Sequence, residues 1–177
     1  MESHLKDRVI KHLQDDFFLE EEAVGINLIE NRHVRIDFLA YPKPKLVERG
    51  FLSAWFGIEV KHIATFGRPG SRGKKSKLLW QAMTYSQSVF ELESSPDNIL
   101  KFRPEFTLVY AGQDDPDTFD DPEWHCLLNL AWYGRTGWLR LLPKSGWAIL
   151  FAGGAYFSKK KGEGNVNVSG IRHTGTI

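Results

Sequence analysis

The chain has 177 residues and nearly balanced charge, with 23 Lys and Arg residues against 22 Asp and Glu residues. A composition that is 42% hydrophobic and 13% aromatic supplies a real core, which excludes a disordered, collagen-like or coiled-coil chain. The single cysteine, Cys126, excludes an internal disulfide framework, an all-cysteine zinc site and a cysteine-ligated iron–sulfur cluster.

The cellular setting is predicted from the first residues and from the longest apolar runs. The first residues are charged and contain no apolar signal core, and no apolar run reaches the roughly 18 residues of a membrane span. We therefore expect a single domain over residues 1–177 in the cytoplasm, with no membrane partner. Because the net charge is only +1, an argument for nucleic acid has to come from local clustering of basic residues.

The N-terminal half of the chain predicts one helix followed by three strands. Apolar residues at helical spacing predict a helix over residues 3–17, and the acidic stretch that follows is interpreted as its solvated end. Alternation of apolar and polar residues predicts strands over 24–29, 34–41 and within 51–63. In the second strand, the even-numbered residues are expected to share one face, and the odd-numbered residues, Asp37 among them, the other.

The C-terminal half predicts two further helices and a hairpin. Helical periodicity predicts a helix over 76–92, and a short apolar run over 105–111 indicates a buried strand. A capping aspartate followed by proline starts a predicted helix over 122–133. Residues 138–142 and 147–151 are typical of a β-hairpin.

This order of elements predicts an α/β fold with a mixed central sheet flanked by helices. Within one domain we expect a core over about 3–111, a helix-and-hairpin extension over about 112–157 and a polar tail over 158–177.

Charged residues in two otherwise apolar strands are the strongest chemical signal. Asp37 lies in one strand and Glu59 in the next, and unpaired charges are costly in strands that bury a face. If the strands are neighbours, the two carboxylates converge and repel each other unless a cation lies between them. Mg²⁺ prefers such oxygen ligands, and the carbonyl of Val60 would add another. Lys61 is placed to hold a water or to stabilise charge on a phosphate.

The segments Ile36-Asp37-Phe38 and Glu59-Val60-Lys61 resemble the PD-(D/E)xK nuclease superfamily, with Ile36 in place of the family proline. Gln81 and Tyr85, one helical turn apart, are similar to the Q-x-x-x-Y element of the RecB-type branch. The resemblance implies a restriction-endonuclease-like α-β-β-β-α-β core and a Mg²⁺-dependent nuclease, with Mn²⁺ as a substitute. It also implies that Gln81 and Tyr85 orient substrate or Lys61.

Family members also carry an acid or a histidine in the first helix. The candidates here are His12, Glu20, Glu21 and Glu22, and the sequence leaves the choice open. Glu20 and Glu21 are favoured because they lie just before the first predicted strand, and Glu21 is included in the expected catalytic set.

A Gly-rich basic segment directly follows the predicted site. Such a segment is suited to follow a phosphate backbone, and five of its residues are predicted to bind nucleic acid: Arg68, Arg72, Lys74, Lys75 and Lys77. The expected partner is DNA, and the sequence leaves RNA open. A homo-oligomer is a further expectation, because two strands require two sites.

The alternative hypothesis is a catalytically inactive protein that keeps the nuclease fold to bind nucleic acid or partner proteins. A third interpretation is structural: Asp37, Glu59 and Lys61 would form an ordinary salt-bridge ladder across adjacent strands. Endonucleolytic and exonucleolytic cleavage are both compatible with the pattern.

Overall fold

The structure, a computed structural model, describes residues 2–63, 71–95, 98–112, 122–142, 146–151, 154–159 and 166–167. The helices in these ranges are α1 (Glu2–Leu13), α2 (Pro44–Val47), α3 (Ser71–Ser86), α4 (Pro122–Ala131) and the 3-10 helix η1 (Trp132–Gly134). The strands are β1 (Phe17–Asn27), β2 (Arg32–Pro42), β3 (Phe56–Val60), β4 (Ser88–Ser95), β5 (Asn98–Phe102), β6 (Thr107–Tyr110), β7 (Thr136–Leu142), β8 (Gly146–Phe151), β9 (Gly154–Lys159) and β10 (Val166–Asn167).

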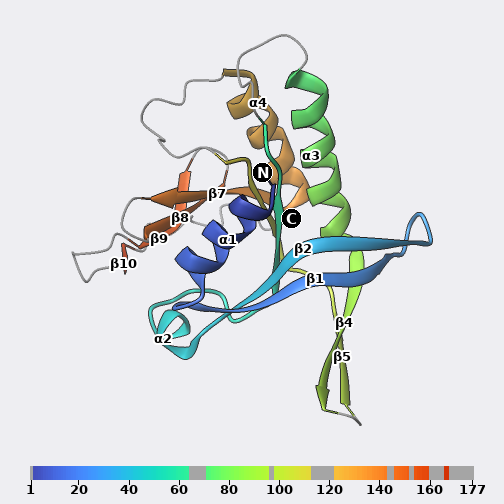
Figure 1. The fold of residues 1–177 in the computed structure, drawn as a ribbon, viewed down its shortest axis with the longest axis vertical. Coiled ribbons are helices and arrows are strands. Elements are labelled where there is room, and N and C mark those ends of the chain that lie inside the picture. Colours follow the sequence, from blue (N-terminus) through green and yellow to red (C-terminus); the bar gives the residue numbers. More distant parts are fainter. Residues whose placement is uncertain are drawn as a thin grey trace.

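The described strands form one ten-stranded sheet in the order β10-β9-β8-β7-β6-β3-β2-β1-β4-β5. β3 pairs with β6 and β6 with β7 in parallel, and the other neighbouring pairs are antiparallel. β4 and β5 extend as an arm away from the rest of the molecule (Figure 1). The predicted α/β class with a mixed sheet is confirmed, and none of the described helices is long and apolar enough to cross a membrane.

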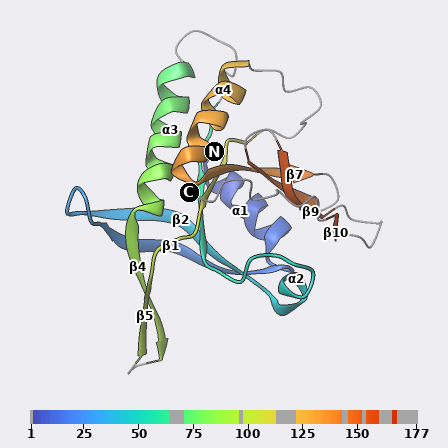
Figure 2. The same cartoon turned by 180° about the vertical axis from the view of Figure 1, so that it is seen from behind.

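Helices cover the central part of the sheet on two faces (Figures 1 and 2). α1 packs Leu5, Val9 and Leu13 into a core that includes residues of β2, β3, β6, β7 and β8. α3 and α4 pack on the other face, where Leu78 and Leu79 belong to one cluster with Val109 of β6 and Trp138 of β7. β3 therefore lies between two apolar layers, and all five of its residues are buried.

Aromatic rings fill the core beneath α1. The ring of Phe56, at the start of β3, stacks on Phe106 at 4.8 Å and meets Phe17 edge-on at 5.4 Å. Phe17 in turn packs against Phe51 at 5.4 Å and Trp147 at 5.1 Å. Each such ring contributes about 1.5–3 kcal/mol by leaving water, so this cluster anchors the beginning of β3 firmly.

The predicted alternation along β2 is wrong at one point. Ile36 packs with Leu39 in the cluster beside α3, whereas Phe38 belongs to the core under α1, so the two faces exchange at Asp37. Glu22, which faces Asp37 on β1, has a left-handed backbone with φ of 53°. The pairing of β1 with β2 is therefore irregular at Glu22, and Asp37 lies opposite this irregular position.

The helix predicted over 76–92 is also wrong at both ends, because α3 begins at Ser71 and ends at Ser86. Residues after it pair with β1 as strand β4. The helix ends where the Ser88 hydroxyl donates to the Thr84 carbonyl at 2.8 Å, and the buried Asn27 amide donates to the same carbonyl at 3.4 Å. A partner from β1 therefore helps to terminate the helix, which no local pattern reveals.

The boundaries of the first helix and the first strand also differ from the prediction. α1 ends at Leu13, and β1 already begins at Phe17, so the acidic stretch lies largely in a strand rather than at a helix end. Charged residues on the exposed face of β1 conceal its alternation. The predicted strand over 105–111, the helix starting at Pro122 and the hairpin of β7 and β8 are confirmed, with α4 ending at Ala131 before η1.

Candidate functional site

The two strands that carry the predicted acids are direct neighbours. β2 and β3 pair antiparallel from Ala40↔Phe56 to Phe38↔Ile58, and the next position in this register places Asp37 opposite Glu59. The backbone pairing stops there, so the strands separate at the two acids. We call this place the fork; it consists of Asp37, Glu59, Val60 and Lys61.

The carboxylate of Asp37 bridges the fork. Its Oδ2 accepts a hydrogen bond of 2.7 Å from the Val60 backbone N–H, in place of a strand-to-strand backbone bond. Its Oδ1 forms an ion pair of 2.6 Å with Nζ of Lys6, and Lys6 also pairs with Glu22. Burial alone would lower the pKa of Lys6, but its hydrogen bonds to Asp37 and Glu22 outweigh burial and raise that pKa.

Glu59 is the buried acid of the fork, with 7% of its surface exposed. Burial raises the pKa of Glu59 to about 8, and the negative charge of Asp37 adds to this effect. Interactions with Tyr85, Lys61 and Lys6 oppose the rise only in part. The two carboxylates are therefore close enough to repel each other, and burial together with the charge of Asp37 favours the protonated form of Glu59.

Tyr85 reaches the fork from α3. Its hydroxyl donates a hydrogen bond of 2.9 Å to the Arg35 carbonyl and also interacts with the Glu59 carboxyl. Burial, followed by the charge of Glu59, raises the pKa of Tyr85, so the phenol stays neutral. Gln81, one turn earlier, lines a cleft of about 210 Å³ together with Tyr85 and a stretch of β2 that includes Arg32 and Arg35.

Lys61 lies just beyond the end of β3 and is half exposed. Its Nζ forms an ion pair of 2.9 Å with Glu2 of α1, and this hydrogen bond raises the pKa of Lys61 against a smaller effect of burial. Glu2 and Lys6 were both missed by sequence reasoning. They lie one helical turn apart on α1, and that spacing on the charged face was the only available signal.

The four candidates for the additional acid or histidine lie on two elements, β1 and α1. Glu20 and Glu21 are exposed on β1. Glu22 reaches it through Lys6, and it also pairs with Arg35 at 3.0 Å. His12 instead contacts the Leu142 carbonyl at 3.2 Å. All three glutamates belong to β1 rather than to the first helix, and Glu2 is the acid of α1 that contacts the fork.

The basic segment is only partly described. Lys74 and Lys77 are exposed on α3, whereas Lys75 is 1% exposed and so does not face solvent as a phosphate ligand would. Arg68 and the side chain of Arg72 lie outside the described residues. Two exposed cations that line the cleft are Arg32 and Arg35 on β2.

The chemistry of the fork fits Mg²⁺ better than a metal that needs a full protein cage. In the ranges described, no three His, Cys, Asp or Glu side chains gather as a metal site. Asp37 and Glu59 would supply two carboxylates, leaving the other positions to backbone, water and phosphate, which is the usual arrangement for Mg²⁺. The raised pKa of Glu59 agrees with this, because a cation between the acids would relieve their repulsion.

Comparison with family models, with curated proteins and with solved structures finds no match for this chain.

Proposed function

We propose that the chain is a divalent-metal-dependent nuclease that hydrolyses phosphodiester bonds of DNA at a PD-(D/E)xK site. The observation that carries this proposal is the meeting of Asp37 and Glu59 at the fork, where the charge of one acid raises the pKa of the other. Two acids held together in this way are unfavourable for stability alone, and they match a site built for a cation.

The arrangement of the elements supports the same proposal. α1, β1, β2, β3, α3 and β6 follow in the order of a restriction-endonuclease-like core, and their strands lie in the sheet as β6-β3-β2-β1. The parallel pair β3/β6 is connected through α3, with the β4–β5 arm inserted before β6. This topology brings α1 and α3 to opposite sides of the fork.

Each residue of the fork has a separate role in this proposal. Asp37 and Glu59 would hold Mg²⁺, which supplies a Lewis acid for the phosphoryl oxygen and an activated water. Lys61 stabilises the negative charge that develops on the phosphate. Tyr85 fixes the Glu59 carboxyl from α3, and Glu2 positions the Lys61 ammonium until substrate arrives.

The surroundings of the fork suit an anionic polymer. Arg32 and Arg35 line the cleft beside Gln81 and Tyr85, and Lys74 and Lys77 are exposed on the neighbouring helix α3. Exposed cations contact phosphates without reading sequence. We assign the cleft to the substrate backbone on one side of the cleaved bond.

Lys6 favours a second candidate function, a non-catalytic protein on the same fold. Its ammonium occupies one oxygen of Asp37, and the Val60 N–H occupies the other. If this pairing persists in the presence of Mg²⁺, Asp37 is a structural residue. The alternative is then a protein that binds nucleic acid without cutting it.

Incubation of supercoiled plasmid with Mg²⁺ tests the proposal directly. Wild type is expected to nick or linearise the DNA, chelator to abolish the reaction, and Lys61→Ala to slow it about 100-fold. Lys45→Ala removes an exposed cation of α2 and serves as the matched control, with unchanged cleavage. Retention of bound but uncut plasmid by wild type would favour the non-catalytic alternative.

A further inference from the structure

A second site lies at the opposite end of β3 from the fork. A pocket of about 340 Å³ is lined by Leu52, Glu105, Phe106, Trp132, Arg135, Phe151 and Tyr156. Phe106 adjoins the start of β3, where Phe106 O accepts the Gly57 N–H at 2.9 Å, whereas the fork adjoins its end. The pocket and the fork have no lining residue in common.

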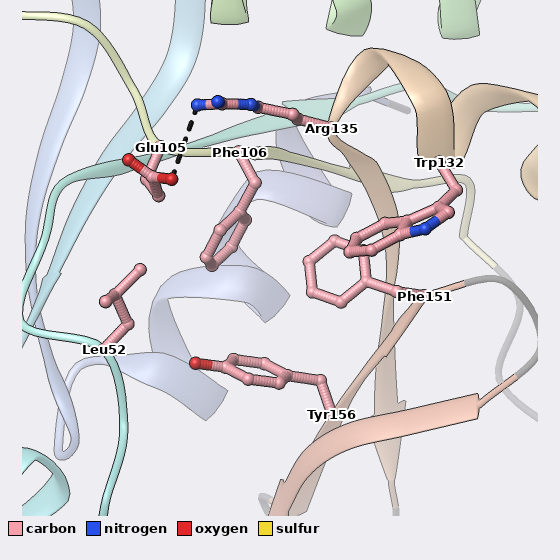
Figure 3. A pocket seen from close by; sticks show the side chains of 7 residues that line it. All are labelled: Leu52, Glu105, Phe106, Trp132, Arg135, Phe151 and Tyr156. Atoms are coloured by element: carbon pink, nitrogen blue, oxygen red, sulfur yellow. Dashed lines mark hydrogen bonds and ion pairs between the residues drawn. The ribbon is translucent and has the colours of Figure 1, made fainter. Parts of the chain in front are cut away.

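Four aromatic rings form the wall of this pocket (Figure 3). Phe151 is central: its ring centroid lies 4.9 Å from that of Trp132, 5.2 Å from Phe106 and 5.6 Å from Tyr156. Phe106 and Phe151 belong to the core and are 7% and 5% exposed, and the partly buried rings of Trp132 and Tyr156 pack against them. Protein interiors are close-packed, so a hollow of this size beside these rings is suited to a ligand. Flat π-surfaces at varied angles favour a planar aromatic guest.

One side of the pocket carries a pair of opposite charges (Figure 3). Nη1 of Arg135 lies 3.4 Å from Oε1 of Glu105, and the two side chains are 65% and 50% exposed. An exposed ion pair of this length contributes little to stability, so it can open to a ligand. The guanidinium then offers donors to an anion, and the carboxylate offers an acceptor to N–H or O–H groups.

The backbone holds Arg135 in place at some cost. Its φ is 55°, a left-handed conformation that is uncommon for a residue with a side chain. Two hydrogen bonds keep it there: its N–H donates to Trp132 O at 2.9 Å, and its carbonyl accepts the Thr107 N–H at 3.0 Å. The start of β6 therefore fixes the position from which Arg135 extends over the pocket.

Tyr156 adds a polar group on the opposite side. Burial raises the pKa of Tyr156 above its ordinary value, and the backbone of Leu52 hydrogen-bonds to the same hydroxyl. This hydroxyl points toward Leu52 across the hollow from the charged pair (Figure 3). A guest in the pocket thus meets apolar walls and polar groups at two sides.

We propose that this pocket binds a nucleotide, with the base against the aromatic rings and the phosphate on Arg135. A ligand that satisfies the whole pocket needs a flat ring, an anion for Arg135 and hydrogen-bond donors for Glu105. A nucleotide carries all three, and base–aromatic stacking is itself strongly favourable. The inference does not depend on the nuclease proposal, because it concerns a different site and needs no metal.

Isothermal titration calorimetry with adenosine 5′-monophosphate in the presence of chelator tests this inference. Wild type is expected to bind it saturably, and Arg135→Asn to raise the Kd at least tenfold, since a charge-assisted hydrogen bond is lost. Asparagine is chosen because it tolerates the left-handed backbone. Lys101→Asn is the matched control, because Lys101 is about as exposed as Arg135 and pairs with Glu91 at 2.7 Å on the β4–β5 arm. The Kd of this variant for the nucleotide should equal that of wild type.

Further ligands and variants distinguish binding of the base from binding of the phosphate. Ribose 5-phosphate, which lacks the base, is expected to bind at least tenfold more weakly than the nucleotide, and Trp132→Leu is expected to weaken nucleotide binding about fivefold or more. Equal binding of ribose 5-phosphate, no saturable heat with wild type, or an unchanged Kd in Arg135→Asn would overturn the proposal. The Lys45→Ala protein, whose substituted residue lies outside both the fork and the pocket, should bind the nucleotide like wild type even if plasmid cleavage is never observed.

The natural source of the base is identified by competition. A single-stranded oligonucleotide that displaces the nucleotide from wild type identifies an unpaired base of a strand as the guest. An oligonucleotide that leaves the nucleotide bound identifies a free nucleotide instead. Both results support binding of a nucleotide in the pocket.

Discussion

The two ends of β3 have opposite chemistry although only a few residues separate them. At the start, Phe56 is fully buried and packs against the rings of Phe17 and Phe106. At the end, Glu59 is almost as deeply buried, but its neighbours are Asp37 and other polar groups. Packing at one end makes the strand a fixed support, and this support holds two repelling acids together at the other end.

This contrast separates stability from activity along one strand. Aromatic burial at the start of β3 stabilises the fold, whereas at the fork burial and the charge of Asp37 disfavour the ionised form of Glu59. Substitutions at the start should therefore reduce stability. Substitutions at the fork should reduce activity while leaving the fold intact or making it more stable.

The largest predicted effect is a loss of stability at the aromatic end of β3. Phe56→Ala leaves a cavity in the core and should lower the free energy of unfolding by about 3–5 kcal/mol, which corresponds to a Tm lower by roughly 10 °C. Thermal and urea unfolding measure this loss. The matched control is Phe18→Ala, because Phe18 is 54% exposed on β1 and should cost less than about 1 kcal/mol. Equal losses at the two positions would refute the anchoring role of Phe56.

The next effect is expected on activity at the fork. Asp37→Asn removes one of the two proposed metal ligands and should slow plasmid cleavage at least about 100-fold, with little change in Tm. Asp15→Asn changes an exposed turn acid in the same way and should cleave like wild type. Full activity of Asp37→Asn would remove Asp37 from the site.

Glu59 predicts a pH dependence of stability whose sign follows from its raised pKa. In the unfolded chain this carboxyl ionises near pH 4.5, but in the folded protein it ionises only near pH 8. Stability is therefore highest below the unfolded value and falls as the pH rises toward 8, by about 2 kcal/mol between pH 6 and pH 8.

Urea unfolding of wild type and Glu59→Gln over this pH range measures the effect. Glu59→Gln should lose the slope, and saturating Mg²⁺ should reduce it in wild type, because a bound cation stabilises the charged carboxylate. A parallel slope in Glu59→Gln and wild type would show that other groups cause it.

The smallest effect is expected at Lys6. Its ammonium competes with a cation for Asp37, so Lys6→Met should strengthen Mn²⁺ binding about threefold to tenfold in calorimetric titrations. Lys11→Met, an exposed position on the same helix, should leave Mn²⁺ binding unchanged. Weaker Mn²⁺ binding in Lys6→Met would mean that Lys6 supports the site instead of competing with it.

Local patterns in the sequence were sufficient for several features. Alternation predicted strands that contain Asp37 and Glu59, and their convergence was predicted on the condition that these strands are neighbours, which the pairing of β2 with β3 meets. The hairpin of β7 and β8 and the start of α4 at Pro122 were likewise predicted from residues adjacent in the chain. These features depend on intrinsic backbone preferences and on the period of apolar residues, both of which are local.

Only the tertiary structure decided the rest. The irregular pairing at Glu22 opposite Asp37, the pairing of Lys6 and Glu2 with the fork, and the end of α3 at Ser86 each depend on contacts between distant segments. The aromatic pocket likewise combines Leu52, Trp132 and Tyr156 from separate parts of the chain. A periodic pattern states which face of an element is apolar, but it carries no information on which distant side chain will meet that face, so these sites emerge only when the sheet is assembled.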